Sequence, residues 1–358
     1  MKRSIAAQTF AAAAVLSLGV HLQGWAAPPP PAVTVSGNTL LADKQPWVSG
    51  GVNITGLVRA QPSTVGASLF NRNPAYFGPT ELAAARAYGA NTVRLQLSEP
   101  ALDPQSPQYV PAYLGRVVEG VRQAEAAGLV VMLCMQWEEP TGVAGLPSMP
   151  DASTGRAWAW LASIFARDPS VVFELFNEPN LPPVTADEPI NSPRRWAAWQ
   201  AAFQPLIDQF RGAGIGNVLI VDGMSWAQTL EGAPALRDPL GQLAYAVHPY
   251  PTVMPETPAG WEARFGGFAQ THPVLITEWI MDSGLFCQPD APGIATSLLN
   301  YAFDHRIGFS GWAFDGPGSL LTTYGGPLTN YDNFRCGPGA LGGLGQSLQA
   351  LFLQRLPQ

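Results

Sequence analysis

Residues 171–179 read VVFELFNEP, a short apolar run that ends in an Asn-Glu pair and a proline. Seven further runs of this kind are spread along the chain. Together the eight runs cover residues 47–54, 92–97, 130–135, 171–176, 218–222, 244–248, 274–278 and 309–314. Their nearly continuous hydrophobicity predicts strands that are covered on both faces, as in a parallel sheet.

Helical patterns fill the gaps between these runs, most clearly in residues 81–88, 112–127, 156–167, 196–211 and 294–305. Strands that alternate with helices are typical of parallel βαβ units. Eight such strands in a chain of 358 residues predict one closed (β/α)8 TIM barrel, longer than the usual length of about 250 residues because of insertions. A short β-hairpin is expected before it, in residues 33–41 around the turn dipeptide Gly37-Asn38.

The first 26 residues have the pattern of a secretory signal peptide. Lys2 and Arg3 form a basic start, residues 5–20 are apolar, and Ala26 is a small residue suited to cleavage. A membrane anchor is the less favoured alternative, because spanning a bilayer takes roughly 20 apolar residues. We expect an exported protein, secreted or periplasmic, with a Pro-rich linker at residues 27–32 and a single domain at residues 33–358.

Lysine and histidine are scarce. The only lysines are Lys2 and Lys44, both ahead of the predicted barrel, so Schiff-base chemistry on a barrel lysine is not expected. His21, His272 and His305 fall in the predicted signal, before a strand and in a helix, so a multi-histidine metal centre is not expected either. A formal net charge of −7 argues against a nucleic-acid partner. We expect a monomer without cofactor, metal ion or membrane partner.

Three cysteines in an exported chain leave one unpaired. Cys134 lies inside an apolar run, whereas Cys287 and Cys336 lie in loop segments after the seventh and eighth predicted strands. These two loops would be neighbours in a closed barrel, and we expect a disulfide between Cys287 and Cys336. Three free thiols are the alternative.

The segments that follow the predicted strands are long, whereas the links from helix back to strand are short. The long segments are residues 56–80, 137–151, 180–193 and 315–339. In a barrel all these segments gather at the carboxyl ends of the strands, where barrel enzymes carry their sites. We therefore expect the functional residues at this end.

Polar or aromatic side chains stand near the carboxyl end of nearly every predicted strand. They are Asn53, Arg94, Gln136, Asn177, Glu178, His248, Tyr250, Glu278 and Trp312. Glu178 and Glu278 follow the fourth and seventh strands, so the two carboxylates would face each other across the barrel mouth. Acid-assisted cleavage of a glycosidic bond requires such a pair. Either glutamate alone would be as well explained by a strand-end ion pair, and the functional interpretation depends on both.

These residues resemble a known family, glycoside hydrolase family 5, the cellulase family of clan A. The similar motifs, in the family's order, are Gly51-Val52-Asn53, Val93-Arg94, Asn177-Glu178-Pro179, Asp222-Gly223-Met224-Ser225-Trp226, His248-Pro249-Tyr250, Thr277-Glu278-Trp279 and Gly311-Trp312. They cover most of the chain after residue 26. The resemblance implies a retaining hydrolase that cleaves β-glycosidic bonds by double displacement. The expected activity is that of an endo-β-1,4-glucanase or a β-mannanase, with a β-linked polysaccharide or oligosaccharide as substrate.

The resemblance also implies roles for individual residues. Glu278 is expected to be the nucleophile, and Glu178 the general acid and then the general base. Arg94 and Tyr250 are expected to donate hydrogen bonds to Glu278 and keep it ionised, while a less compensated environment raises the pKa of Glu178. Asn177 is expected to bind the sugar 2-hydroxyl.

Other residues are expected to support the substrate. His248 would orient its neighbours, with a satisfied core histidine as the alternative. Trp312 would form a flat floor under the sugar ring that is cleaved. Trp137, Trp226 and Trp279 are candidate sugar platforms, and packing is the alternative for each of them.

One position departs from the family pattern. The third strand usually ends in a histidine, but here Gln136 occupies that place. Glutamine can hydrogen-bond a sugar hydroxyl, but it cannot carry a proton, so a pH-dependent contribution from this position should be absent.

Two alternatives to an endo-acting enzyme remain open at this point. An exo-acting, β-glucosidase-like enzyme would differ in having a pocket closed at one end, which depends on how residues 137–151 and 315–339 fold. A carbohydrate-binding protein on a decayed enzyme scaffold would explain the aromatic residues. It would have no use for both Glu178 and Glu278.

Overall fold

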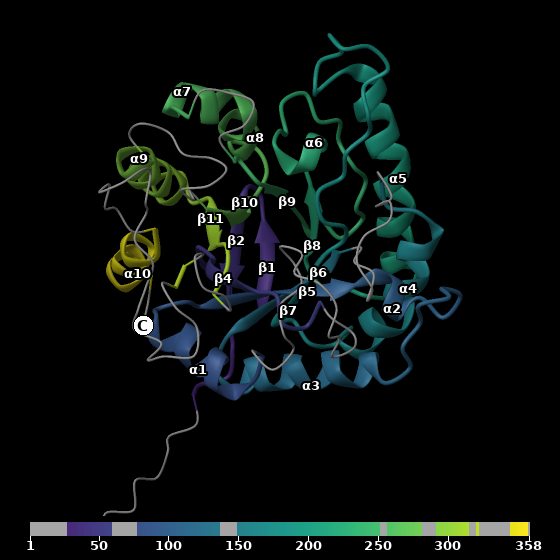
Figure 1. Ribbon diagram of the computed structural model, residues 1–358, viewed down its shortest axis with the longest axis vertical. Helices are drawn as coiled ribbons and strands as arrows, with labels where there is room; N and C mark the ends of the chain where they lie inside the picture. Colours follow the sequence, from purple (N-terminus) through teal and green to yellow (C-terminus); the bar gives the residue numbers. More distant parts are fainter. Residues whose placement is uncertain are drawn as a thin grey trace, which may run out of the picture.

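The computed structural model describes residues 27–58, 77–136, 149–250, 256–280, 291–314, 320–321 and 344–356. Eight parallel strands close into a barrel, which confirms the predicted fold (Figure 1). The strands are β4 (Gly50–Ile54), β5 (Thr92–Ser98), β6 (Val130–Gln136), β7 (Val171–Glu174), β8 (Leu219–Asp222), β9 (Leu243–Val247), β10 (Val274–Trp279) and β11 (Gly308–Gly311). Each strand pairs with the next along the chain, and β11 pairs with β4 to close the circle.

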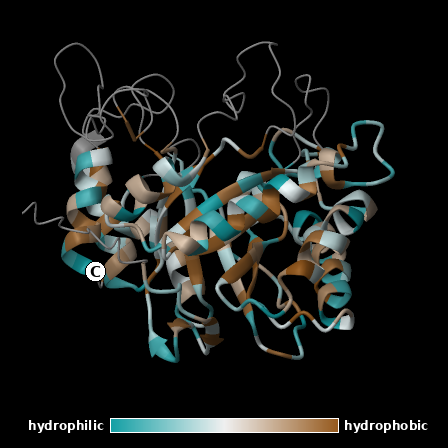
Figure 2. Cartoon of the chain, turned by 90° about the horizontal axis from the view of Figure 1, so that it is seen from below, coloured by the Kyte–Doolittle hydropathy of each residue, from teal (hydrophilic) through white to brown (hydrophobic). Residues whose placement is uncertain are grey.

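Helices surround the strands (Figure 1). The longer ones are α1 (Pro79–Ala87), α3 (Tyr113–Ala126), α4 (Ala152–Ile164), α5 (Pro193–Gly212), α9 (Ala291–Asp304) and α10 (Leu344–Arg355). The short ones are α2 (Glu99–Leu102), α6 (Met224–Ala227), α7 (Pro258–Trp261), the π-helix η2 (Glu262–Gly266) and α8 (Gly267–Ala269). Hydrophobic residues concentrate where helices and strands face each other (Figure 2). No helix in the described ranges is both long and apolar enough to cross a bilayer.

Four helices, α1, α4, α5 and α9, begin earlier than the sequence patterns indicated, and capping explains two of these starts. Helix α4 begins at Ala152 because Asp151 and Thr154 form a capping box, in which each side chain binds the backbone of the other. Helix α5 begins at Pro193, after Ser192 accepts a hydrogen bond from the Arg195 N–H. Helix α10 was not expected from the sequence.

Tryptophans of α4 and α5 bind the ends of the strands that carry the site. Trp158 of α4 donates through Nε1 to the Leu175 carbonyl just beyond β7, at 2.9 Å. Trp199 of α5 donates to the Asp222 carbonyl at the end of β8, at 2.7 Å. Both indoles are fully buried. The backbone at the carboxyl ends of β7 and β8 is therefore held by side chains from outside the barrel.

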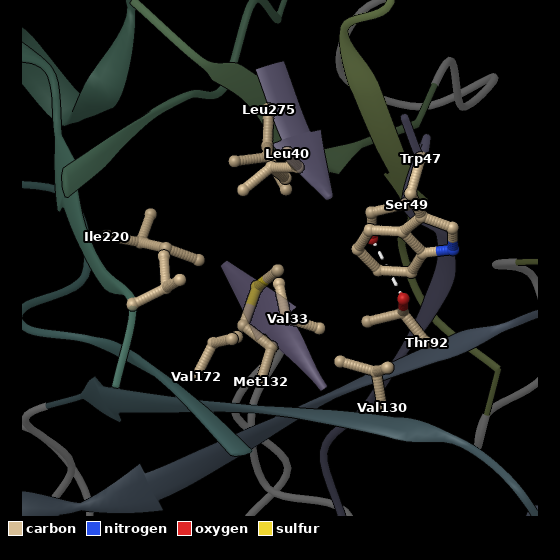
Figure 3. Close-up of a pocket in the computed structure, with 11 residues that line it drawn as sticks. Val33, Leu40, Trp47, Ser49, Thr92, Val130, Met132, Val172, Ile220 and Leu275 are labelled. Carbon is tan, nitrogen blue, oxygen red and sulfur yellow. Dashed lines mark hydrogen bonds between the residues drawn. The ribbon is translucent and has the colours of Figure 1, made fainter. Parts of the chain in front are cut away.

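A small antiparallel sheet, β1 (Val33–Ser36), β2 (Thr39–Ala42) and β3 (Gln45–Pro46), precedes the barrel. The first two strands are the predicted hairpin, and β3 extends it. Val33 and Leu40 are buried against interior residues of the barrel strands, including Met132, Val172 and Leu275 (Figure 3). The hairpin thus covers an apolar layer inside the barrel, at the end away from the predicted site.

Substitution of Leu40 by alanine should destabilise the fold by about 2–5 kcal/mol, the usual cost of emptying a leucine site in a core. The matched control is the neighbouring Leu41, which is only half-buried because adjacent strand residues point to opposite faces. Leu41→Ala should cost clearly less. The measurement is urea unfolding followed by circular dichroism. Equal losses in the two variants would mean that the hairpin does not seal the barrel.

Candidate active site

Arg94 on β5 is the centre of the polar layer inside the barrel. Its side chain is fully buried, and it binds Glu174 through Nε at 2.6 Å and through Nη2 at 2.9 Å. It also donates through Nη1 to Glu278 at 3.0 Å. Its remaining hydrogen bonds go to Asn53 Oδ1, Asn177 Oδ1 and Cys134 Sγ. One guanidinium therefore fixes two buried carboxylates and both asparagines.

Glu278 at the end of β10 receives both hydrogen bonds that the sequence led us to expect. Arg94 Nη1 donates to Oε2 at 3.0 Å, and the Tyr250 hydroxyl donates to Oε1 at 2.9 Å. Gln96 Nε2 lies 3.4 Å from Oε2. Burial raises the pKa of Glu278 above its usual value, whereas Arg94 and Tyr250 act in the opposite direction and favour its ionised form, as expected of these donors. Burial also raises the pKa of Tyr250, so its hydroxyl keeps its proton and remains a donor.

Glu178 lies opposite, just beyond β7, and within the described part of the chain no arginine or lysine lies at ion-pair distance from it. Its backbone is left-handed, with φ of 56°, and its N–H donates to Asp222 Oδ2 at 2.9 Å. Strained backbone of this kind is common at functional sites. Its carboxyl contacts His248 Nδ1 at 2.8 Å. Burial raises the pKa of Glu178 to about 7, with a further contribution from the charge of Glu174. The side chain remains 23% exposed, so a ligand can reach it.

The two glutamates lie close together across the barrel mouth. Carboxylate oxygens of Glu178 and Glu278 and a ring nitrogen of His248 all lie within 4.8 Å of one another. A second group, Glu174, Asp222 and His248, is equally compact and fully buried. Arg94 already supplies positive charge to Glu174 and Glu278. A guanidinium therefore balances part of the negative charge in each cluster.

Asp222 at the end of β8 is a buried carboxyl that faces another carboxyl, Glu174. Burial and the neighbouring charge of Glu174 raise the pKa of Asp222 well above its usual range. The side chains of Asp222 and Glu174 also share a hydrogen bond. Two carboxyl groups can share one only if one of them is protonated, and the raised pKa places that proton on Asp222. Asp222 then serves the site through Oδ2, which holds the backbone of Glu178.

Four residues of this layer were given no role by the sequence interpretation: Glu174, Asp222, Thr277 and Cys134. Glu174 interrupts the apolar run 171–176, and a charged residue inside a strand buried on both faces was a usable signal. Asp222 and Thr277 were part of the family motifs without an assigned function. Cys134 was expected to be free inside a strand, and it is a buried free thiol in β6.

The tryptophans differ in exposure. Trp279 is fully buried and donates through Nε1 to the Pro249 carbonyl at 3.0 Å, so it is a packing residue. Trp312 follows β11 and is 9% exposed. Its backbone N–H donates a hydrogen bond to the Trp279 carbonyl. Trp226 is 53% exposed, and its backbone N–H donates to the carbonyl of Pro179, the residue after Glu178. Trp226 is therefore available to stack on a sugar beside Glu178.

The turn that carries Trp226 has an unusual backbone. Ser225, Trp226 and Ala227 all have positive φ, at 60°, 58° and 58°. Arg195 of α5 donates to the Ser225 hydroxyl at 2.7 Å. The Ala227 carbonyl accepts the N–H of His248 at 2.7 Å. The same turn thus places an exposed indole at the rim and anchors the backbone of His248.

Gln136 ends β6 beside Ser98 of β5. It is almost buried, and its Oε1 has no hydrogen-bond partner among the residues that the structure describes. This oxygen can accept a hydrogen bond from a ligand hydroxyl. Trp137, Cys287 and Cys336 lie outside the described residues, as does the predicted signal segment, and these predictions remain as they were.

Comparison with known proteins points in one direction. The family model for cellulase, glycosyl hydrolase family 5, matches residues 66–317. A mannan endo-1,4-beta-mannosidase of Streptomyces lividans is 25% identical over 246 residues, which are 66% of this chain and 58% of that protein. One of Cellvibrio japonicus is 25% identical over 268 residues, or 72% of this chain and 55% of that protein. The chain thus spans a little over half the length of these curated relatives.

Solved structures share the barrel. A β-glucanase from Saccharophagus degradans, in complex with cellotetraose, superposes with a TM-score of 0.65 at 23% identity, covering 92% of this chain and 94% of that one. A β-mannanase from Streptomyces thermolilacinus with mannohexaose gives 0.60 at 20% identity, covering 84% and 91%. At these identities the likeness shows the fold.

Proposed function

The chain belongs to glycosyl hydrolase family 5, and on this premise we propose that it is a retaining, endo-acting hydrolase of β-1,4-linked glucan or mannan. The observation that carries the proposal is the short distance between the carboxylates of Glu178 and Glu278, within 4.8 Å between oxygens. Retaining enzymes hold their two carboxyl groups about 5–5.5 Å apart, whereas inverting enzymes need roughly 6.5–9.5 Å to admit a water.

The geometry assigns different work to the two carboxyls. Glu278 faces Arg94 and Tyr250, which stabilise its ionised form, so it is the group that attacks the anomeric carbon. Glu178 has a pKa of about 7 and is protonated in mildly acidic solution, so it can protonate the departing glycosidic oxygen. In the second step Glu178, now ionised, removes a proton from water, which attacks the glycosyl ester on Glu278.

Several residues around the pair suit sugar binding. Asn177 is held by Arg94 beside the nucleophile, where its amide nitrogen can donate to a 2-hydroxyl. Gln136 offers an unpartnered oxygen. Trp312 supports the ring being cleaved, and exposed Trp226 supports the sugar next to Glu178. The choice of glucan or mannan follows from the relatives, which are named as mannan endo-1,4-beta-mannosidases and as a β-glucanase. The pattern of residues 1–26 supports export as part of the proposal.

The test is hydrolysis of a panel of β-glucans, mannans, xylans and aryl β-glycosides. We expect a rapid fall in the viscosity of a soluble glucan or mannan, with release of a range of oligosaccharides. Release of single terminal sugars without loss of viscosity would support the exo-acting alternative. Binding without any hydrolysis would support the decayed carbohydrate-binding protein and contradict the proposal.

The pH profile should follow the carboxyls. Cleavage requires a protonated Glu178, so kcat/KM on a polysaccharide should fall as pH rises through about 7, the pKa of that group. As pH falls, kcat/KM should also decrease where Glu278 gains a proton. Because the pKa of Glu278 is raised, this decrease should begin at a higher pH than for an ordinary glutamate. The measurement is kcat/KM between pH 4 and pH 9. Activity that stays constant to pH 9 would contradict the assignment of Glu178.

A further inference from the structure

A chain of hydrogen bonds runs from buried Glu174 to the proposed acid. Glu174 Oε1 accepts from the Thr277 hydroxyl at 3.0 Å. The Thr277 oxygen lies 2.9 Å from His248 Nε2. His248 Nδ1 lies 2.8 Å from Glu178 Oε1. Glu174, Thr277 and His248 are each fully buried, so solvent does not compete for these contacts.

The donors and acceptors along this series of hydrogen bonds show which atom carries each proton. Glu174 accepts two hydrogen bonds from Arg94 and one from Thr277, and arginine holds its pKa below the usual value, so it is ionised and can only accept. Thr277 has one hydroxyl proton, which it donates to Glu174. Its oxygen must then accept from His248 Nε2, which therefore carries the ring proton.

The charge of the His248 ring determines whether its second nitrogen, Nδ1, also carries a proton. Burial lowers the pKa of His248 to about 4, so the ring is neutral in mildly acidic and neutral solution and carries one proton. With that proton on Nε2, Nδ1 presents a lone pair to Glu178. The 2.8 Å contact is a hydrogen bond only if Glu178 is the donor.

We infer that Thr277 is a positioning residue that fixes His248 in the Nε2–H form, so that His248 in turn retains the acid proton on Glu178. The inference rests on the proposed role of Glu178. It serves both steps of that reaction: the proton is kept until the glycosidic oxygen takes it. Afterwards the lone pair of Nδ1 faces an ionised carboxylate, which favours recovery of a proton from the attacking water.

Other charged and titratable groups face the same region from each neighbouring strand, namely Arg94, Cys134, Glu174, Asp222, Tyr250 and Glu278. Of these groups, Arg94 lowers and Glu174 raises the pKa of Glu178. Asp222 Oδ2 and Glu174 Oε1 lie 3.9 and 4.0 Å from His248 Nε2, beyond hydrogen-bond distance. Within the described ranges, Thr277 is the group at hydrogen-bond distance from Nε2.

The first test is nuclear magnetic resonance of the full chain labelled with ¹⁵N-histidine, near pH 6. A ring nitrogen that carries a proton is well separated in chemical shift from one that does not, and a His248→Gln variant identifies the signals. We expect His248 to be neutral with the proton on Nε2. A proton on Nδ1 would overturn the inference. This result does not depend on any hydrolysis, so it remains decisive if the proposed activity is absent.

The second test compares Thr277→Val, which removes the hydroxyl at nearly equal volume, with Thr277→Ser, which keeps it. In the valine variant Nε2–H loses its acceptor, so the proton should move to Nδ1 and stabilise ionised Glu178. The alkaline limb of kcat/KM should then move down by roughly 0.5–1 pH unit, the size of one neutral hydrogen bond. In the serine variant, the tautomer of His248 and the alkaline limb of kcat/KM should both stay as in the parent protein.

A valine variant with an unchanged tautomer or an unchanged alkaline limb would overturn the inference. Loss of structural stability alone would lower activity at every pH without moving the limb. If the valine variant does not fold, the tautomer in the parent and in Thr277→Ser decides the question. An Nδ1–H signal in either protein would be the contrary result.

Discussion

Replacement of Glu278 by glutamine is expected to lower kcat/KM at least about 10²-fold on every substrate, whatever its leaving group. The carboxylate oxygen that forms the glycosyl ester is lost, and an amide cannot take its place in the first step. Arg94 keeps its two hydrogen bonds to Glu174 in the variant, so the barrel interior should hold. The measurement is steady-state kinetics on a polysaccharide and on an aryl glycoside.

The matched control is Glu99→Gln. Glu99 is as deeply buried as Glu278, but its carboxylate binds Ser153 and Thr154 at the start of α4. Turnover of this control should remain near that of the parent. Near-normal activity of Glu278→Gln, or an equal loss in both variants, would contradict the role of Glu278.

Replacement of Glu178 by glutamine should have an effect that depends on the leaving group. On a polysaccharide the loss should again be at least about 10²-fold, because the glycosidic oxygen leaves without a proton. An aryl glycoside with a good leaving group needs no acid in the first step. The variant should then release a rapid burst of phenol and accumulate a glycosyl ester on Glu278, since no base activates water for the second step.

Mass spectrometry of the intact Glu178→Gln variant should detect that ester as an added sugar mass. The Glu278→Gln variant, which lacks the attacking oxygen, is the control and should show neither burst nor added mass. An equal loss on polysaccharide and on activated aryl glycoside would be incompatible with acid catalysis by Glu178.

The barrel could be predicted from the sequence because each of its strands is an apolar run of its own. The two catalytic candidates could be predicted because polar residues after such runs must gather at one end of a barrel. The first residues of the helices were harder to predict. The pattern of apolar residues places the start of α4 near Arg156, whereas the capping box of Asp151 and Thr154 places it at Ala152.

The connections within the site depend on side-chain direction, which the sequence shows only weakly. Trp226 and Trp279 both stand near strand ends, yet one is exposed and the other is fully buried. Glu174 lies in the middle of an apolar run, and only the pairing of β7 with its neighbours shows that it points at Arg94. The pKa of Glu278 could not be predicted from its donors alone, because the degree of burial decides its direction.

Retention of anomeric configuration is the central claim, and the stereochemistry of the first product tests it most directly. Oxygens of Glu178 and Glu278 within 4.8 Å leave no room for a water between nucleophile and sugar, so Glu278 should attack carbon itself. Proton nuclear magnetic resonance of a β-linked oligosaccharide digest, recorded before mutarotation, should therefore show the β-anomer first. An initial α-anomer would show direct attack by water and would contradict the role of Glu278 as nucleophile.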